Sequence, residues 1–239
     1  MSAGQQHEVV FRQAPLKTAD VLPGELVEEN RFLLIRGPPG SGRTTLARTV
    51  PRALWGRFGS LCNEPYSAIL HAVSTYVRQE GDERIRQAVG DEGVAVLSTM
   101  IPVLADGTST KVTLEDCGQR FAYVLRLCLR ATDRPLILDD VDYADPASLD
   151  LFTTILTDVE SHFCVVGVCR DGDLPESLTS RLRDMAEHHV PMAEVPLKER
   201  TERTMGRWSR EQLLELSSDD LELLQTAACL GVYPSLRLL

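Results

Sequence analysis

The nine residues from position 37 to position 45 read GPPGSGRTT and have the residue types of a loop that binds phosphate. Glycines in such a loop let successive backbone N–H groups turn toward phosphate oxygens, and a hydroxyl at its end can bind Mg²⁺. A short apolar run precedes the loop and a helix-forming stretch follows it, which is the setting that this chemistry needs. The candidate phosphate-binding residues are Gly37, Pro38, Pro39, Gly40, Ser41, Gly42, Arg43, Thr44 and Thr45.

One position of this loop departs from the G-x-x-x-x-G-K-[ST] pattern, because Arg43 stands where the pattern has lysine. A lysine reaches the terminal phosphates as a compact charge, whereas the guanidinium of arginine is a larger planar fork. Arg43 keeps the positive charge and can contact phosphate through two nitrogens. Thr44 is the candidate Mg²⁺ ligand and Thr45 the second candidate. A glycine-rich turn that binds nothing is the alternative interpretation.

Two acidic residues, Asp139 and Asp140, follow an apolar run at residues 136–138. Open α/β sheets bind ligands outside the carboxyl ends of their strands, so both carboxylates are expected at the ligand-binding edge. Asp139 is the candidate Mg²⁺ ligand, directly or through water, and Asp140 is the candidate acid that polarises an attacking water. The simpler alternative is a pair of solvated acids at the end of a strand.

A further apolar run ends in Arg170. At the same sheet edge its side chain could contact the outermost phosphate of a bound ligand and so report its presence. An ion pair with Asp171 or Asp173 is the alternative role for this arginine.

Short apolar runs alternate with longer segments of helical periodicity along most of the chain. This alternation predicts an α/β fold in which buried, mostly parallel strands are joined by helices. Strands are predicted at residues 32–35, 136–138, 163–168 and, more weakly, 189–195. Helices are predicted after Gly42 and at residues 65–78, 114–130 and 146–159, with Thr113 and Asp145 as N-caps. Short helices and a loop are predicted between residues 78 and 113.

The composition excludes some classes of partner. The 239 residues carry a formal net charge of −10, which gives no general attraction to nucleic acid or anionic membranes. The six cysteines contain no C-x-x-C pair, and no apolar run approaches the length that spans a bilayer. We therefore expect a cytoplasmic protein with reduced cysteines, without a membrane partner and with nucleic acid disfavoured as a ligand.

Three segments differ in character along the chain. We expect an N-terminal segment at residues 1–28, an α/β core at residues 29–197 and a truncated helical appendage at residues 198–239. The appendage contains SSDDLELLQTAACLGV, which has the pattern of a capped amphipathic helix.

Five blocks between residues 32 and 175 carry a resemblance to a known family. They are FLLIRGPPGSGRTTL, GRFGSLCNEPYSAILHAVSTYV, GDEGVAVLSTMIPVL, GQRFAYVLRLCLRATDRPLILDDVDYADPASLDLFTTIL and FCVVGVCRDGDLP. In this order they resemble the AAA-type ATPase domain of the STAND and ORC-like P-loop NTPases, as found in multidomain signalling proteins beside kinase or cyclase domains.

The resemblance implies a three-layer αβα core with an additional strand between the Walker A and Walker B strands. It implies that residues 37–45 bind the triphosphate of ATP or ADP, that Asp139 binds Mg²⁺ with Thr44, and that Asp140 orients water. Arg170 would end the sensor strand. The family implies a nucleotide-dependent switch that works through other signalling proteins or domains.

The chain also departs from the family pattern. Arg43 replaces the Walker A lysine, and FRQAPLKTAD stands where the family has a segment that helps to hold the base. The stretch between ARTVPRAL and WGRFG is too short for the usual second strand. The family's helical lid is absent, because VPL at residues 195–197 passes almost directly to the C-terminal segment.

Two functions follow from these residues. The first is an ATP-binding switch module with weak or absent hydrolysis, since misplaced charge impairs a transition state more than it impairs binding. The alternative is a degenerate domain that binds no nucleotide and serves as a protein-interaction module. A phosphotransferase is disfavoured, because no cluster of arginines typical of a substrate lid follows Arg170.

Overall fold

The computed structural model describes residues 12–13, 24–59, 64–105, 118–158, 162–172 and 174–197. The chain divides into two compact units, residues 1–199 and 200–239, and the second lies outside the described residues. The strands are β1 (Arg12–Gln13), β2 (Phe32–Gly37), β3 (Leu54–Arg57), β4 (Leu136–Asp139), β5 (Val165–Arg170) and β6 (Met192–Pro196). The helices are α1 (Gly24–Glu29), α2 (Arg43–Ala47), α3 (Ser67–Glu80), α4 (Glu83–Ser98), α5 (Gly118–Ala131), α6 (Pro146–Thr157) and α7 (Glu176–Glu187), with short 3₁₀ turns at Pro102–Leu104 and Val141–Tyr143.

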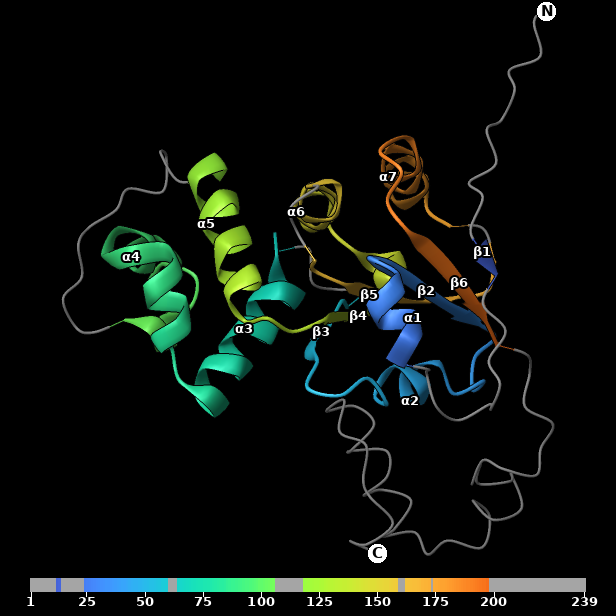
Figure 1. Ribbon diagram of the computed structural model, residues 1–239, viewed down its shortest axis with the longest axis horizontal. Coiled ribbons are helices and arrows are strands. Elements are labelled where there is room, and N and C mark those ends of the chain that lie inside the picture. Colours follow the sequence, from blue (N-terminus) through green and yellow to red (C-terminus); the bar gives the residue numbers. More distant parts are fainter. Residues whose placement is uncertain are drawn as a thin grey trace, which may run out of the picture. The chain divides into compact units, whose positions relative to one another are not determined.

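The strands form one six-stranded sheet in the order β1-β6-β2-β5-β4-β3 (Figure 1). Every neighbouring pair is parallel, which confirms the predicted parallel sheet. Strand β5 lies between β2 and β4, so the additional strand implied by the resemblance is present. Because all strands run the same way, the residues that follow β2, β3, β4 and β5 meet at one edge of the sheet.

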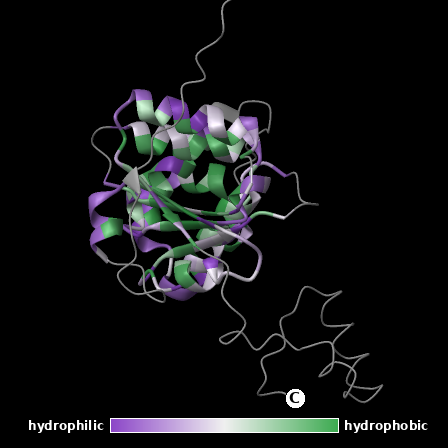
Figure 2. Cartoon of the chain, turned by 90° about the vertical axis from the view of Figure 1, so that its right-hand side faces the viewer, coloured by the Kyte–Doolittle hydropathy of each residue, from purple (hydrophilic) through white to green (hydrophobic). Residues whose placement is uncertain are grey.

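Helices cover both faces of the sheet, which confirms the three-layer αβα prediction. Alternate residues of β2 supply the two hydrophobic clusters: Phe32 and Leu34 pack with α3 to α7, and Leu33 and Ile35 pack with α1 and α2. Figure 2 shows hydrophobic strands between helices whose outer surfaces carry the hydrophilic residues. A strand that is buried on both faces reads as a continuous apolar run, which is why β2 could be predicted from the sequence.

The structure corrects one expectation about strands, because the stretch after α2 does form a second strand. Helix α2 ends at Ala47, and a turn with Arg52 at φ 54° leads directly into β3. This four-residue strand pairs with β4 at the edge of the sheet. Helix α3 packs closely against it, since a Cβ on Gly56 would lie 2.5 Å from the carbonyl oxygen of Ala68.

The predicted helices α3, α5 and α6 are present within a few residues of their expected bounds. Asp145 is confirmed as the N-cap of α6, because its side chain accepts a 2.8 Å hydrogen bond from the backbone N–H of Ser148. Helix α4 is interrupted at Gly90, as expected for two short helices. Helices α1 and α7 were not predicted, and α1 spans the expected boundary between residues 28 and 29.

Other expectations lie outside the described residues, namely the Thr113 cap and the helix of the C-terminal appendage. Within the described ranges, no helix is long and apolar enough to cross a membrane.

Candidate nucleotide site

The loop between β2 and α2 has a backbone that depends on its glycines. Gly40 and Gly42 have φ values of 80° and 89°, which residues with a Cβ rarely adopt. Gly37 is required for a different reason, since a Cβ there would lie 2.6 Å from Oγ of Ser41 and 2.9 Å from Cβ of Leu197. Gly40 and Gly42 are therefore required by their backbone conformation, and Gly37 is required by close packing.

Two buried polar atoms of this segment have no hydrogen-bond partner among the described residues. They are Oγ of Ser41 and Nη1 of Arg43. Leaving a buried donor unpaired costs free energy, so such atoms commonly mark a ligand that the protein is built to hold. A phosphate oxygen would accept from both groups. The loop thus has unsatisfied donors of the kind that a bound anion needs.

Thr44 and Asp139 are brought together from 95 positions apart in the sequence. The Oγ1 of Thr44 donates to the carboxylate of Asp139, at 3.3 Å from Oδ1 and 3.2 Å from Oδ2. Thr45, the second candidate, is exposed and makes no such contact in the described structure. A hydroxyl and a carboxylate are hard oxygen donors of the type that Mg²⁺ prefers.

Asp139 is buried at the end of β4 with only 3% of its surface exposed. Burial is the largest cause of a raised pKa for this carboxyl, and the charge of Asp140 adds to it, while Arg57 and the hydrogen bond from Thr44 act in the opposite direction. A bound cation would compensate this charge. Within the described residues no cluster of three acidic, histidine or cysteine side chains surrounds it, so phosphate and water would supply the remaining ligands.

Asp140, the candidate water-polarising acid, is held by a residue that sequence reasoning missed. Its Oδ2 accepts a 2.9 Å hydrogen bond from Nε of Arg57, which ends β3. Asp140 has φ 55°, so its backbone is in the left-handed region. Predicting Arg57 required recognising β3, because an arginine at the end of that strand lies in register with Asp139.

Arg170 lies at the end of β5, and its described neighbours include an aspartate that the sequence did not suggest. Its guanidinium stacks 5.2 Å from the ring centroid of Tyr143, and its Nε lies 4.0 Å from Oδ2 of Asp142. Both partners belong to the 3₁₀ turn that follows β4. No ion pair joins Arg170 to Asp171, and Asp173 lies outside the described residues.

The residues at this sheet edge enclose an open cavity of about 420 Å³. Strands β3, β4 and β5 deliver its charged groups, and helix α3 adds a hydroxyl. The lining residues are Arg57, Phe58, Gly59, Ser67, Asp140, Tyr143 and Arg170. The candidate catalytic acid and the candidate sensor arginine thus share one cavity.

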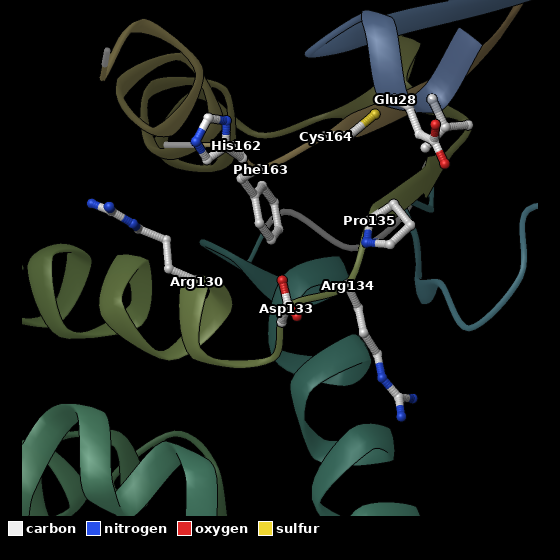
Figure 3. A pocket seen from close by; sticks show the side chains of 9 residues that line it. Glu28, Arg130, Asp133, Arg134, Pro135, His162, Phe163 and Cys164 are labelled. Atoms are coloured by element: carbon white, nitrogen blue, oxygen red, sulfur yellow. The ribbon is translucent and has the colours of Figure 1, made fainter. Parts of the chain in front are cut away.

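A larger cavity, of about 500 Å³, lies at the opposite edge of the sheet where β4 and β5 begin. Two arginines that line it form ion pairs within the protein: Arg130 with Asp158 at 2.9 Å and Arg134 with Glu80 at 3.1 Å. Figure 3 shows both side chains pointing away from the space between Phe163 and Pro135. The candidate phosphate-binding residues lie at the other edge of the sheet.

Comparison with known proteins agrees with this geometry. A family model described as an AAA ATPase domain matches residues 9–166, which is more than half of the chain. The chain therefore belongs to the AAA ATPase domain family, and the predicted AAA-type resemblance is confirmed. The family is one of P-loop modules that bind nucleotide. The search of curated proteins found no match.

Among solved structures, the chain is similar to a crystal structure of a Signal Transduction ATPase with Numerous Domains (STAND) protein with a tetratricopeptide repeat sensor from Pyrococcus horikoshii. The identity is 13% and the TM-score 0.38, over 90% of this chain. The match covers 30% of that protein's length. The fold assignment rests on the strand order described above.

Proposed function

We propose that this AAA ATPase domain binds Mg·ATP and Mg·ADP at residues 37–45 and acts as a nucleotide-dependent switch with weak or absent hydrolysis. The observation that carries this proposal is the contact between Thr44 and Asp139 at 3.2–3.3 Å. P-loop NTPases hold Mg²⁺ with a threonine or serine of the loop and with the Walker B aspartate. Thr44 and the buried Asp139 at the end of β4 are the corresponding residues here. Thr44 and Asp139 would hold Mg²⁺, which would neutralise negative charge on the phosphates when bound.

The arginine in place of lysine supports retained but weakened binding. One charge-assisted hydrogen bond contributes roughly 1.5–3 kcal/mol, so losing a lysine contact outright would reduce affinity by about 10- to 150-fold. Arg43 is cationic and has a buried nitrogen without a hydrogen-bond partner among the described residues. A guanidinium can replace part of the lost contact, although its reach differs from that of an ammonium.

Weak hydrolysis is supported by the environment of Asp140. Its carboxylate already accepts a hydrogen bond from Arg57, so it is a poorer acceptor for the proton of an attacking water. This contact reduces general-base catalysis while leaving the phosphate loop untouched.

We further propose that the chain is a STAND-type switch whose partners are other signalling proteins or domains. The five ordered sequence blocks support this assignment. A switch needs two states whose equilibrium the nucleotide shifts, so ATP and ADP must bind with different affinity. Arg170, at the end of β5 beside the loop, is the side chain that we assign to contact the γ-phosphate.

The proposal is tested by titrating Mg·ATP and Mg·ADP into the wild type, Arg43→Lys and Arg43→Ala, with calorimetry as the measurement. We expect saturable binding by the wild type and by Arg43→Lys, and at least roughly tenfold weaker binding by Arg43→Ala. Arg48→Ala removes a nearby cation that stacks on Trp55 and is the matched control. Absence of saturable binding by all four proteins at millimolar nucleotide would establish the degenerate interaction module instead.

A further inference from the structure

Arg36 is the last residue before the first glycine of the phosphate loop, and its side chain is bound by two other segments. Its Nη1 donates to Oε1 of Glu194 on β6 at 3.1 Å, and its Nη2 donates to the carbonyl oxygen of Gly172 at 2.6 Å. Gly172 belongs to the loop that follows β5. One guanidinium therefore joins the ends of three neighbouring strands, β5, β2 and β6.

Backbone hydrogen bonds reinforce the same junction. The N–H of Asp171 donates to the carbonyl of Gly37 at 3.1 Å, and the N–H of Leu197 donates to the carbonyl of Arg36 at 2.6 Å. Hence the loop after β5 is tied to β2 twice, by the side chain of Arg36 and by the backbone of Gly37. The side-chain tie is the one that a substitution can remove without altering the sheet.

Gly172 has a conformation that makes this tie possible. Its φ of 124° is outside the range that residues with a Cβ commonly adopt, while the space around its Cα is open. The glycine is thus required by backbone conformation and not by crowding. Arg170, which we assign to the γ-phosphate, lies two residues earlier, at the end of β5.

The pair of Arg36 and Glu194 is well suited to a fixed geometry. Their side chains are only 24% and 18% exposed, so the pair is partly shielded from solvent and salt. The planar fork of arginine directs its two terminal nitrogens to different acceptors at once, which the single ammonium of lysine does less well. The two terminal nitrogens of Arg36 contact Glu194 and Gly172, and its buried Nε has no hydrogen-bond partner among the described residues.

We propose that Arg36 is a positioning residue: by holding Gly172 and Glu194 it fixes the loop that begins directly after Arg170, and thereby sets how strongly the site prefers ATP over ADP. This inference rests on the proposed function. Without this tie, the backbone bond from Asp171 to Gly37 remains, and the described contacts of the Arg170 side chain are the Tyr143 ring and the 4.0 Å approach to Asp142. The γ-phosphate contact then weakens, while contacts to the phosphates shared by ATP and ADP remain.

The experiment measures the dissociation constants of Mg·ATP and Mg·ADP for full-length wild type, Arg36→Gln and Gly172→Ala. Arg36→Gln removes the donor of the hydrogen bond to Gly172, whereas Gly172→Ala keeps the carbonyl acceptor but disfavours the backbone conformation that places it. We expect each to reduce the preference for ATP by at least about fivefold, with little change in ADP affinity. Arg183→Gln removes an ion pair with Glu176 on α7, and Gly81→Ala strains a glycine at φ 84° in open space, so these are the matched controls.

A double-mutant cycle with Arg170→Gln separates positioning from a general structural role. If Arg36 acts through Arg170, then Arg36→Gln has no further effect on the ATP-to-ADP ratio once Arg170 has been replaced. A merely structural role would instead weaken both nucleotides alike and lower the melting temperature in every background.

The outcomes distinguish the two proposals. A wild type that binds neither nucleotide rejects the proposed function and this inference with it. A wild type that binds ATP and ADP equally rejects the proposed switch together with this inference, whereas an unchanged ratio in both Arg36→Gln and Gly172→Ala rejects the inference alone. If Arg36→Gln proves unfolded by circular dichroism, Gly172→Ala decides the question, because Gly172 lies in a loop and contributes no core side chain.

Discussion

The Nε of Arg57 and Oδ2 of Asp140 lie 2.9 Å apart across the ends of β3 and β4. Arg57 is half exposed, whereas Asp140 is mostly buried, so the exposed partner can be replaced without opening the core. The pair joins two residues that are 83 positions apart in the sequence. As a consequence, the carboxylate of Asp140, the candidate catalytic acid, already accepts a hydrogen bond from Arg57.

Replacing Arg57 is therefore expected to increase hydrolysis. Arg57→Gln frees the carboxylate of Asp140 to orient water, and we expect the rate of phosphate release at saturating Mg·ATP to rise roughly tenfold. Arg120→Gln, which removes an exposed pair with Glu92 on another face, is the control. A fall in rate for Arg57→Gln would mean that Arg57 assists the reaction and does not restrain it.

We expect the buried charge of Asp139 to lower the stability of the nucleotide-free protein and to bind Mg²⁺ when nucleotide is present. Its folded pKa is raised by burial, so the ionised form opposes folding in the nucleotide-free protein. We expect Asp139→Asn to increase the free energy of unfolding by about 0.5–2 kcal/mol at neutral pH. Mg·ATP should then raise the melting temperature of the wild type but not of the variant.

The same raised pKa fixes the sign of the pH dependence. A carboxyl that binds its proton more tightly in the folded state contributes stability below its unfolded pKa, and this contribution is lost as the pH rises through the folded value. The stability advantage of Asp139→Asn should therefore be smallest near pH 4 and grow toward neutral pH. Thermal melts at several pH values test this, and an advantage that shrinks as the pH rises would contradict the assignment.

The phosphate loop should be sensitive to a single methyl group. Gly42→Ala places a Cβ on a residue at φ 89°, which costs roughly 1–3 kcal/mol and displaces the amides of the loop. We expect lower thermal stability and loss of nucleotide binding by calorimetry. Gly24→Ala in α1, where nothing lies within 4 Å, should be neutral or slightly stabilising.

Three cysteines should be unreactive in the folded protein. Cys128, Cys164 and Cys169 are buried, and burial raises the pKa of each thiol to about 12. Their thiolate fraction at pH 8 is negligible, so we expect no alkylation by iodoacetamide until the protein is unfolded. Peptide mapping by mass spectrometry distinguishes them from the other cysteines. Rapid labelling of Cys164 under native conditions would show that β5 opens locally.

Much of the fold follows from local patterns in the sequence. Strands β2, β4 and β5 are buried on both faces, so their residues form apolar runs that can be recognised without a partner. The cap at Asp145 is equally local, because its acceptor and the N–H of Ser148 are three residues apart. Strand β3 was not predicted. Only every second one of its four residues is buried, so its sequence contains no apolar run.

The candidate site likewise combines residues that local sequence patterns predict with contacts that depend on the fold. The glycine loop, the threonine that follows it and the acids at the end of β4 could be predicted without the fold, since each is a short pattern next to an apolar strand. The fold was needed to find that Asp140 pairs with Arg57, that Arg170 stacks on Tyr143, and that Arg36 contacts Gly172. These contacts join segments far apart along the chain, and their geometry exists only once the parallel strands align their ends at one edge of the sheet.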